Sequence, residues 1–244
     1  MTDVNINEIF YSLQGEGTYT GVPMTFVRLQ GCPWDCSWCD TRRTWDTDSE
    51  EGQILTVDQI EKIVKETGTK WVCLTGGEPL SQPKAFEALV RRFKEAGYSI
   101  EVFTSGLNSF PRGDTFNLVD SWALDYKLAS ARLSKGKPFE KNIPRLRKQD
   151  QLKLVVSTEN DLKEIDELRP ERLTDATILL SPVFEWEPGY EHEWKDSWER
   201  GEIASSGKRS SLEFWREVVE FCKERNYRLS LQVHKLLYGD ISGV

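Results

Sequence analysis

Apolar and polar residues follow one another along the chain in blocks that switch between the repeat of a strand and that of a helix. Short apolar runs predict strands at residues 24–29, 71–74, 99–103, 121–124, 151–156, 177–180 and 228–233. Apolar residues spaced by three or four positions predict helices at residues 57–64, 83–97, 159–168 and 211–224. Strands that alternate with helices form parallel sheets with right-handed crossovers. The pattern therefore predicts an α/β fold, either a full or a partly open βα barrel.

Local signals mark where these helices begin and end. Thr56 is followed three residues later by Gln59, the spacing of a capping box at a helix start. Gly68 ends this first helix, while Pro83 begins the second and Gly97 ends it. The sequence contains no internal repeat and no long low-complexity tract. Its 244 residues are therefore predicted to form a single domain spanning residues 1–244.

Residues 184–210 interrupt this rhythm. They are rich in Glu, Trp, Gly and Ser and follow no clear period. A stretch of this kind within a compact domain is typical of an insertion or a lid. Four aromatic residues within it either cover a site or anchor the loop itself: Trp186, Tyr190, Trp194 and Trp198.

Charge and cysteine content narrow the classes of function. The chain has 32 basic and 40 acidic residues and a net charge of −8, which disfavours binding to nucleic acid. The local cluster of Arg145, Arg147 and Lys148 is interpreted as a solvated helix face. No apolar run approaches the length of a membrane span, and residues 1–14 lack the pattern of a secretory signal. Five cysteines, three of them clustered, indicate metal chemistry in a reducing compartment and hence the cytoplasm.

The three clustered cysteines directly follow the first predicted strand. Cys32, Cys36 and Cys39 have the spacing C-x3-C-x2-C on one loop. Iron–sulfur clusters are held by cysteine thiolates. Three thiolates on a four-iron cluster leave one iron open, and an open metal position is typical of a catalytic rather than a structural site. S-adenosylmethionine (SAM) can chelate such an iron through its amino and carboxylate groups.

A zinc site is the alternative for this loop. Zinc requires a fourth ligand, and the remaining Cys and His residues are Cys73, Cys222, His192 and His234. Cys73 lies within an apolar strand and Cys222 within a helix, so both are expected to be packed core thiols. A carboxylate as the fourth ligand stays open.

Further motifs follow the next predicted strands. Residues 76–78 come after the second strand, residues 104–106 after the third and residues 125–127 after the fourth. The carboxyl ends of parallel strands share one face of a βα barrel, and that face carries the active site. Motifs distributed over a hundred residues are therefore expected to meet at one mouth.

These motifs resemble those of the 7-carboxy-7-deazaguanine synthase family of the radical SAM superfamily. The cysteine spacing and the run Gly76-Gly77-Glu78-Pro79 are typical of the superfamily. The opening Leu13-Gln14-Gly15-Glu16-Gly17 and the loop ending Cys39-Asp40-Thr41 are typical of the family. The resemblance covers most of the chain and implies a single-domain, partial (open) βα barrel of the radical SAM type.

The resemblance implies a 4Fe–4S cluster on Cys32, Cys36 and Cys39, and SAM beside it. The implied SAM contacts are Ser37, Trp38, Gly76, Gly77, Glu78, Gly106, Asp125, Tyr126 and Lys127. Glycine suits such a site because, without a Cβ atom, it allows close backbone approach. On their own, residues 76–79 would be only a strand-to-helix turn, and a lysine after a strand is often a surface group.

The implied substrate is 6-carboxy-5,6,7,8-tetrahydropterin, bound by Leu13, Gln14, Gly15, Glu16, Arg28, Thr104 and His234. Arg28 shares a strand face with Met24 and Phe26, so it needs an acidic partner, which is either the substrate carboxylate or Glu8. Thr41 matches the family's magnesium ligand, although Asp40-Thr41 could equally cap a helix. His234 either contacts substrate or is structural.

The implied reaction begins when the reduced cluster cleaves SAM to methionine and a 5′-deoxyadenosyl radical. Hydrogen abstraction from the pterin, ring contraction and loss of ammonia then give 7-carboxy-7-deazaguanine. Flavodoxin or ferredoxin is the expected electron donor, and a homodimer is the expected assembly. Two departures affect substrate detail: Phe103 replaces a frequent glutamate before Thr104, and the segment 184–210 is longer than in compact members.

Two other functions are compatible with part of this pattern. An activating enzyme for a glycyl-radical protein shares the cluster and SAM motifs, but it requires an open groove for a polypeptide. A zinc-stabilised binding module without catalysis would use the cysteines alone. Metal analysis distinguishes the last from both enzymes.

Overall fold

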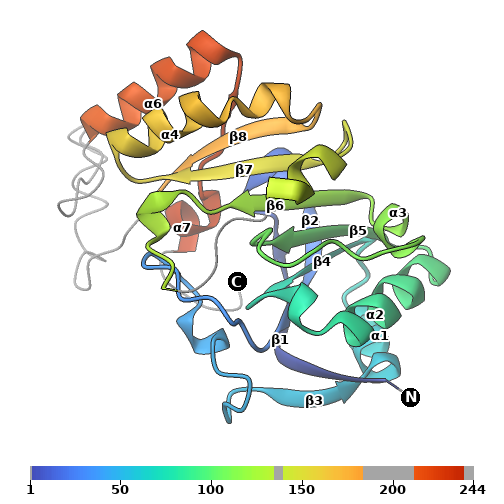
Figure 1. Cartoon of the computed structure of the whole chain (residues 1–244). Helices are drawn as coiled ribbons and strands as arrows, with labels where there is room; N and C mark the ends of the chain where they lie inside the picture. Colours follow the sequence, from blue (N-terminus) through green and yellow to red (C-terminus); the bar gives the residue numbers. More distant parts are fainter. Residues whose placement is uncertain (1, 135–139, 184–211, 239–244) are drawn as a thin grey trace.

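The computed structural model describes residues 2–134, 140–183 and 212–238, and these form one curved sheet with most of its helices on the outer side (Figure 1). The predicted insertion at residues 184–210 lies outside this part. The strands are β1 (Asp3–Leu13), β2 (Pro23–Leu29), β3 (Gln53–Thr56), β4 (Trp71–Gly76), β5 (Ser99–Thr104), β6 (Ser121–Tyr126), β7 (Gln151–Val156), β8 (Thr177–Pro182) and β9 (Arg228–Leu229). The α-helices are α1 (Val57–Glu66), α2 (Pro83–Glu95), α3 (Thr115–Leu118), α4 (Glu159–Leu168), α6 (Leu212–Arg225) and α7 (Val233–Tyr238).

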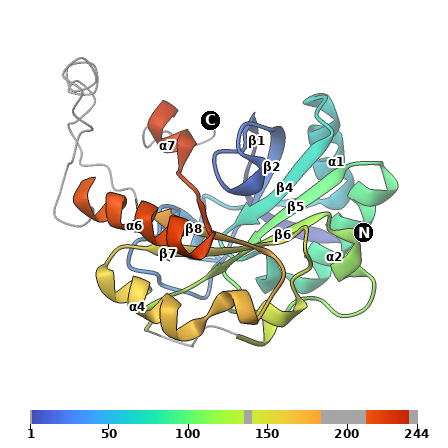
Figure 2. The same cartoon turned by 90° about the horizontal axis from the view of Figure 1, so that it is seen from above.

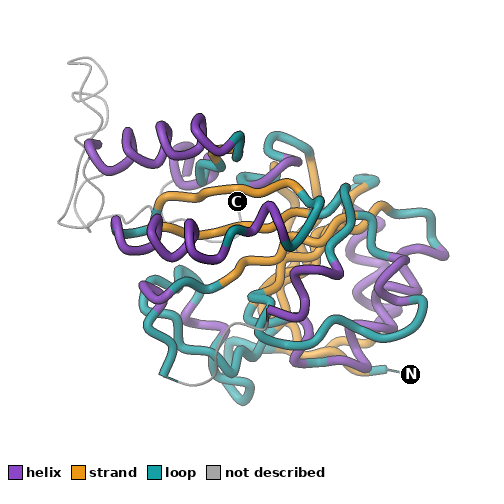
Figure 3. The backbone as a smooth tube through the Cα atoms, turned by 45° about the horizontal axis from the view of Figure 1, so that its top comes forward, coloured by secondary structure: helices purple, strands orange, loops and turns teal. Residues whose placement is uncertain are grey.

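The sheet of the described residues has the order β3-β1-β2-β4-β5-β6-β7-β8-β9. All pairs from β2 to β9 are parallel, whereas β1 pairs antiparallel with both β2 and β3. The sheet ends at β3 and β9 instead of closing on itself, which confirms the partly open form and excludes the full barrel. Seen from above, the strands fan out between the two groups of helices (Figure 2). A tube view shows the same continuous strand layer with helices around it (Figure 3).

Two strands were missed from the sequence, and one was predicted too long. The missed strands are β1 and β3; in β1 the apolar–polar alternation that begins at Val4 breaks at Glu8, where the pairing with β2 shifts register. β1 tolerates polar residues such as Asn5, Asn7 and Glu8 because it lies near the sheet edge and borders a polar site. The last strand was predicted at residues 228–233, but β9 ends at Leu229 and the chain then turns into the short helix α7. The capping box of Thr56 and Gln59 at the start of α1 is confirmed.

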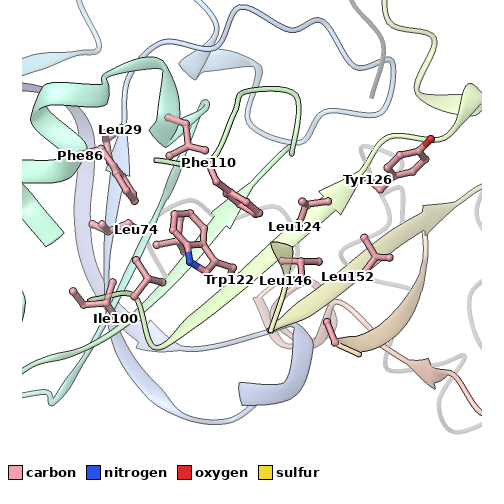
Figure 4. Packing of buried hydrophobic residues seen from close by; sticks show 14 of the residues in the cluster. Leu29, Leu74, Phe86, Ile100, Phe110, Trp122, Leu124, Tyr126, Leu146 and Leu152 are labelled. Atoms are coloured by element: carbon pink, nitrogen blue, oxygen red, sulfur yellow. The ribbon is translucent and has the colours of Figure 1, made fainter. Parts of the chain in front are cut away.

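The main hydrophobic core lies between the sheet and the outer helices. Trp122 on β6 is fully buried between Phe86 of α2 and Phe110, with ring centroids 5.8 Å and 4.7 Å away (Figure 4). Val27 and Leu29 of β2 point into this core. Burial of such large side chains contributes about 1.5–3 kcal/mol each. Packing between the sheet and the outer helices therefore stabilises the fold without a contribution from the concave face of the sheet.

A smaller apolar cluster occupies the concave side of the sheet. Met24 and Phe26 of β2 pack there with Cys73 of β4, and the partly buried Phe103 packs against them. These residues form the floor beneath the carboxyl ends of the strands. Arg28 follows Met24 and Phe26 by the period of two, so it points to the same side, as predicted.

Candidate active site

The predicted motifs meet in one pocket above this floor. Its lining comes from β1, β2, β4, β5, β6, β7, their following loops and α7. It includes these predicted site residues: Leu13, Gln14, Gly15, Glu16, Arg28, Cys32, Cys36, Trp38, Cys39, Thr41, Gly76, Gly77, Thr104, Asp125, Lys127 and His234. Ser37, Glu78, Gly106 and Tyr126 are not in this lining. The expectation that strand ends place distant motifs at one mouth is confirmed for most residues.

The cysteine loop is fixed by hydrogen bonds of its backbone. Gly31 N donates to the Thr44 carbonyl at 2.8 Å, and Ser37 N donates to the Ala131 carbonyl at 2.8 Å. Cys32, Cys36 and Cys39 all line the same pocket. Burial raises the pKa of the Cys32 thiol to about 12 and also raises the pKa of Cys36. Without a metal these two groups are therefore protonated thiols at neutral pH, and metal binding must displace their protons.

Unpaired polar atoms around this loop show that the pocket fits a polar cofactor. The buried indole nitrogens of Trp34 and Trp38, and Oδ1 of Asp125, have no hydrogen-bond partner among the described residues. All three residues line the pocket. Buried polar atoms in folded proteins are nearly always paired. Three thiols together with unpaired donors and an unpaired carboxylate oxygen fit an iron–sulfur cluster with a bound SAM.

The two glycines after β4 allow its backbone to approach the end of β2. Gly76 has φ of +130°, and a Cβ atom there would lie 2.3 Å from the Leu29 backbone. A Cβ atom on Gly77 would lie 2.3 Å from the Gly31 carbonyl oxygen. Only glycine fits in such close contact. The cysteine loop and the residue pair 76–77 therefore share one wall of the pocket.

The Glu78 side chain lies outside the pocket lining and is bound within the protein. Its fully buried carboxylate accepts hydrogen bonds from Leu80 N at 3.0 Å, Thr104 Oγ1 at 2.7 Å and Ser105 N at 2.9 Å, as well as from Ser105 Oγ. The side chain thus anchors the loop after β5. Gly106 lies in that loop with φ of +69°. Tyr126 likewise points into the main core, where it packs at the end opposite Phe86 (Figure 4).

Buried ion pairs connect the predicted SAM side of the pocket to the predicted substrate side. Lys127 Nζ lies 3.0 Å from Asp125 Oδ2 and 4.4 Å from the centre of the Trp38 ring. Lys153 on β7 contacts the Glu16 carboxylate and lies 3.9 Å from Asp125 Oδ2. Burial opposes charge on these groups, but Asp125 raises the pKa of Lys127, and Glu16 raises that of Lys153. The pairs keep their charges because each compensates the other.

The predicted substrate side is organised around Glu16. Lys153 lowers the pKa of Glu16 against the effect of burial, so this carboxylate is ionised. His234 Nε2 lies 4.0 Å from Glu16 Oε1, and burial lowers the pKa of the imidazole. A Cβ atom on Gly15 would collide with the His234 ring, so Gly15 lets α7 approach. His234 is therefore a neutral ring at pH 7, held between Gly15 and Glu16.

Arg28 pairs with Glu8, the structural partner considered for it. Its Nε donates to Glu8 Oε1 at 2.7 Å, and Arg43 Nη2 contacts the same oxygen at 2.6 Å. Arg28 and Arg43 both line the pocket. One carboxylate thus holds two guanidinium groups, which leaves this side of the pocket positive and suited to an anionic ligand.

Thr41 lies beside the cysteines and makes no side-chain cap to the following turn of residues 42–44. Its Oγ1 lies 3.8 Å from Cys39 Sγ and faces the pocket. The neighbouring Asp40 lies 3.2 Å from Lys235 Nζ of α7. Although burial works against it, Lys235 lowers the pKa of Asp40 to about 2.

Several lining residues were missed from the sequence: Lys153, Arg43, Asp40, Gln232 and Lys235. Lys153 alternates with Gln151 and Val155 on β7, and a polar residue inside an apolar strand was the available signal. Arg43, Asp40, Gln232 and Lys235 lie in loops or on α7, where no period marks an inward side. The expected alternative roles of Cys73 and Cys222 as packed thiols are confirmed, since both are buried.

The open βα sheet and the three cysteines after β2 define a protein of the radical SAM class. The family model described as the radical SAM superfamily matches residues 26–113, from β2 to the loop before α3. Within the described residues, no group of three His, Cys, Asp or Glu side chains is arranged to hold a single metal ion.

Close relatives share nearly the whole chain. A 7-carboxy-7-deazaguanine synthase from Thermoplasma acidophilum is 35% identical over 98% of this chain and 99% of its own. The synthase from Clostridium acetobutylicum is 36% identical over 95% of each chain. The crystal structure of QueE from Escherichia coli matches with a TM-score of 0.71 and 26% identity over 95% of each chain. This chain belongs to the 7-carboxy-7-deazaguanine synthase family, and membership of the radical SAM class implies a 4Fe–4S cluster and SAM.

Proposed function

We propose that this protein converts 6-carboxy-5,6,7,8-tetrahydropterin to 7-carboxy-7-deazaguanine with loss of ammonia. The observation that carries the proposal is one pocket that joins the three cysteines to Gln14, Glu16 and Arg28. The family assignment over nearly the full chain supports this reaction over activation of a glycyl-radical protein and over a zinc-stabilised module.

Cys32, Cys36 and Cys39 would hold the cluster, and the backbone of Gly76 and Gly77 would hold SAM beside it. When bound and reduced, this pair of cofactors supplies the radical that abstracts hydrogen from substrate. Asp125 offers its unpaired Oδ1 to a SAM donor, and Lys127 holds that carboxylate from the other side. We assign Glu78 to fixing the loop of Ser105 and Gly106, through which it shapes the SAM site.

On the substrate side, the free edge of Arg28 would bind the pterin carboxylate, with Glu8 fixing its Nε. Glu16, kept ionised by Lys153, would accept hydrogen bonds from the pterin ring. Neutral His234 would donate or accept one proton at the ring edge. Leu13, Gln14, Gly15 and Thr104 would complete this surface, while Phe103 presents a ring where many relatives are expected to have a carboxylate.

Thr41 would provide one oxygen to a Mg²⁺ ion that is otherwise bound by substrate oxygens and water. Magnesium prefers oxygen ligands and keeps several waters, so a single hydroxyl from the protein is sufficient. We also propose flavodoxin or ferredoxin as the electron donor, a cytoplasmic homodimer as the working form, and a single domain in which residues 184–210 are an insertion. None of the helices in residues 2–134, 140–183 and 212–238 has the length and apolar content of a membrane span.

The test is an anaerobic incubation of cluster-loaded protein with SAM, reductant, Mg²⁺ and the carboxypterin. Mass spectrometry should detect 7-carboxy-7-deazaguanine and ammonia. Substrate and product differ by ammonia alone, so the hydrogen taken by the 5′-deoxyadenosyl radical is returned during productive turnover, and methionine and 5′-deoxyadenosine mark only uncoupled SAM cleavage. Chelation of Mg²⁺ should lower the rate of product formation and leave iron content unchanged. Cluster-loaded protein that leaves both SAM and pterin intact under strong reductant would contradict the proposal.

A further inference from the structure

A buried carboxyl group lies directly beneath the substrate side of the pocket. Glu101 and Phe103 point to the same side of β5 by the period of two, and Phe103 reaches the pocket while Glu101 lies one pleat deeper. Glu101 is completely buried. A buried acid without a charged partner is costly, so it requires donors from the protein.

Two glutamine side chains supply these donors from opposite sides. Gln14 Nε2 donates to Glu101 Oε2 at 2.5 Å, and Gln151 Nε2 donates to Glu101 Oε1 at 2.8 Å. The other neighbours of Gln14 Nε2 are the sulfurs of Cys73 at 3.8 Å and Met24 at 4.0 Å, which are weak acceptors. Gln151 Nε2 also donates to Ser121 Oγ at 3.1 Å. Glu101 is therefore the strong acceptor that orients Gln14, and it orients Gln151 together with Ser121.

The Oε1 atoms of both amides accept hydrogen bonds from the backbone of residues 14–18, the segment that carries most of the predicted substrate contacts of β1 and the following loop. Gln14 Oε1 accepts from Glu16 N at 3.3 Å, and Gln151 Oε1 accepts from Thr18 N at 2.9 Å. Each glutamine can do this only while its NH₂ group faces Glu101. If either amide rotated by half a turn, it would present NH₂ to a backbone N–H and lose that bond.

We propose that Glu101 is a positioning residue that orients Gln14 and Gln151 and thereby holds residues 14–18 in place for substrate binding. The inference rests on the proposed function for the identity of the substrate, but its geometric part concerns this chain alone. Glu101 does not line the pocket, so it acts through Gln14 and through Gln151.

The pattern of donors and acceptors makes a sharp prediction for Glu101→Gln. The new amide has one acceptor atom, but it faces two NH₂ groups, so one neighbour must rotate and release Glu16 N or Thr18 N. We expect the KM for the carboxypterin, measured at pH 8 where a pKa of about 7 leaves the Glu101 carboxyl ionised, to rise about 10-fold or more, the effect of losing a hydrogen bond to a charged group. SAM cleavage without substrate should stay at the wild-type rate, because Glu101 has no contact with the cysteine loop or with residues 76–78 in the described structure.

A double variant provides the rescue. Glu101→Gln combined with Gln151→Glu lets residue 101 accept from Gln14 and donate to the new carboxylate, which still accepts from Thr18 N. This variant should return KM to within about threefold of wild type, because every donor again meets an acceptor. Asp150→Asn is the matched control: Asp150 is also a buried acid, but it binds Trp122 N and Arg147 outside the pocket. It should lower stability and leave KM unchanged.

The experiment compares these cluster-loaded, full-length proteins by steady-state kinetics and by amide hydrogen exchange. Faster exchange at Glu16 or at Thr18 in Glu101→Gln, reversed in the double variant, supports the inference. Wild-type KM and exchange in the single variant would overturn it, as would a folded double variant that shows no recovery of either. Exchange is measured without turnover, so the result stands even where the wild-type protein forms no deazapurine.

Discussion

At the scale of single residues, the charged side chains of the pocket form ion pairs of opposite charge. Lys153 lies between Glu16 and Asp125, and Lys127 shares Asp125. Such pairs do little for stability, because their attraction roughly offsets the cost of removing them from water. Their effect is to hold the polar groups of the pocket in defined positions. Glu101 differs, because amides surround it and no basic group pairs with it in the described structure.

Glu101 should therefore make stability depend on pH. Burial raises its pKa from an ordinary value of 4.5 to about 7, against the two amide hydrogen bonds, and the nearby Glu16 adds to the rise. Other ionisable groups that interact with it are Tyr19 and the Cys73 thiol, both neutral at these pH values. Between pH 4.5 and 7, the folded state keeps the Glu101 proton while the unfolded state releases it. The free energy of unfolding therefore falls as pH rises from 4.5 to 7.

The expected loss over this window is about 3 kcal/mol. Urea denaturation of cluster-free wild-type protein at pH 4.5, 6 and 8 measures it, with Glu101→Gln as the reference that lacks the titrating group. The difference in free energy of unfolding between wild type and Glu101→Gln should fall from pH 4.5 to 7 and stay constant above pH 8. Parallel curves for both proteins at all pH values would contradict the assignment of this group.

Gly76 is a second residue with a testable role. Gly76→Ala places a methyl group against the Leu29 backbone at a φ of +130°. We expect a loss of about 2–3 kcal/mol in stability, since backbone must move, and a marked loss of SAM binding by isothermal titration. Gly97→Ala is the control: it also has positive φ, at +85°, but open space around the site. It should cost about 1 kcal/mol and leave SAM affinity unchanged.

At the scale of elements, α7 completes the pocket. Its first residue donates from Val233 N to the Gly15 carbonyl at 2.9 Å, and Gln232 Nε2 donates to Glu16 Oε1 at 3.2 Å. Lys235 reaches across to Asp40 in the cysteine loop. This short helix thus bridges residues 15–16 and the loop that carries the thiols. A six-residue helix has little stability of its own, so these contacts hold it.

Lys235→Ala should loosen α7 and raise the KM for the carboxypterin about fivefold, which corresponds to about 1 kcal/mol for a partly buried ion pair. The low pKa of Asp40 means that the pair persists at all pH values above 4, so the effect should not vary between pH 6 and 8. Lys223→Ala on α6 is the control, because its partner Glu220 is exposed and remote from the pocket. Equal KM values for the two variants would show that the ion pair of Lys235 and Asp40 is not needed to hold α7 in place.

At the scale of the whole molecule, the fold and the site occupy opposite sides of one sheet. Trp122, Phe86 and the other large buried residues pack on the convex side, under the helices. The cysteines and ion pairs lie on the concave side, above the small cluster of Met24, Phe26 and Cys73. The fold can therefore form before the cofactors bind.

Cys36→Ala should separate these two properties. We expect complete loss of the iron–sulfur absorbance and of SAM cleavage, because three thiolates are needed for the cluster. Far-UV circular dichroism and the urea midpoint of the cluster-free protein should stay close to wild type. Cys222→Ala, which removes a buried thiol packed on α6, is the counterpart and should keep the iron content while lowering stability. An unfolded Cys36→Ala protein would assign the loop a structural role.

Periodicity was sufficient for the parallel part of the fold. Strands β2, β4, β5, β6, β7 and β8 are largely buried, so each contains a recognisable apolar run, and the helices between them have one apolar side. The motifs directly after these strands followed from the same pattern. Hence the cysteines, Gly76 and Asp125 could be placed at one mouth from the sequence, because in a parallel sheet position along the chain fixes position in space.

Only the tertiary structure decided which polar side chains face one another. Arg43, Asp40 and Lys235 approach the pocket from loops and from α7, where no repeat relates sequence to direction. The separate functions of Glu78 and Glu101 were equally invisible, because each depends on donors that lie 26 residues or more away along the chain. The sequence determined the sheet and its catalytic edge through local apolar period, whereas the partners of each buried charge were set by contacts that form only when distant segments pack together.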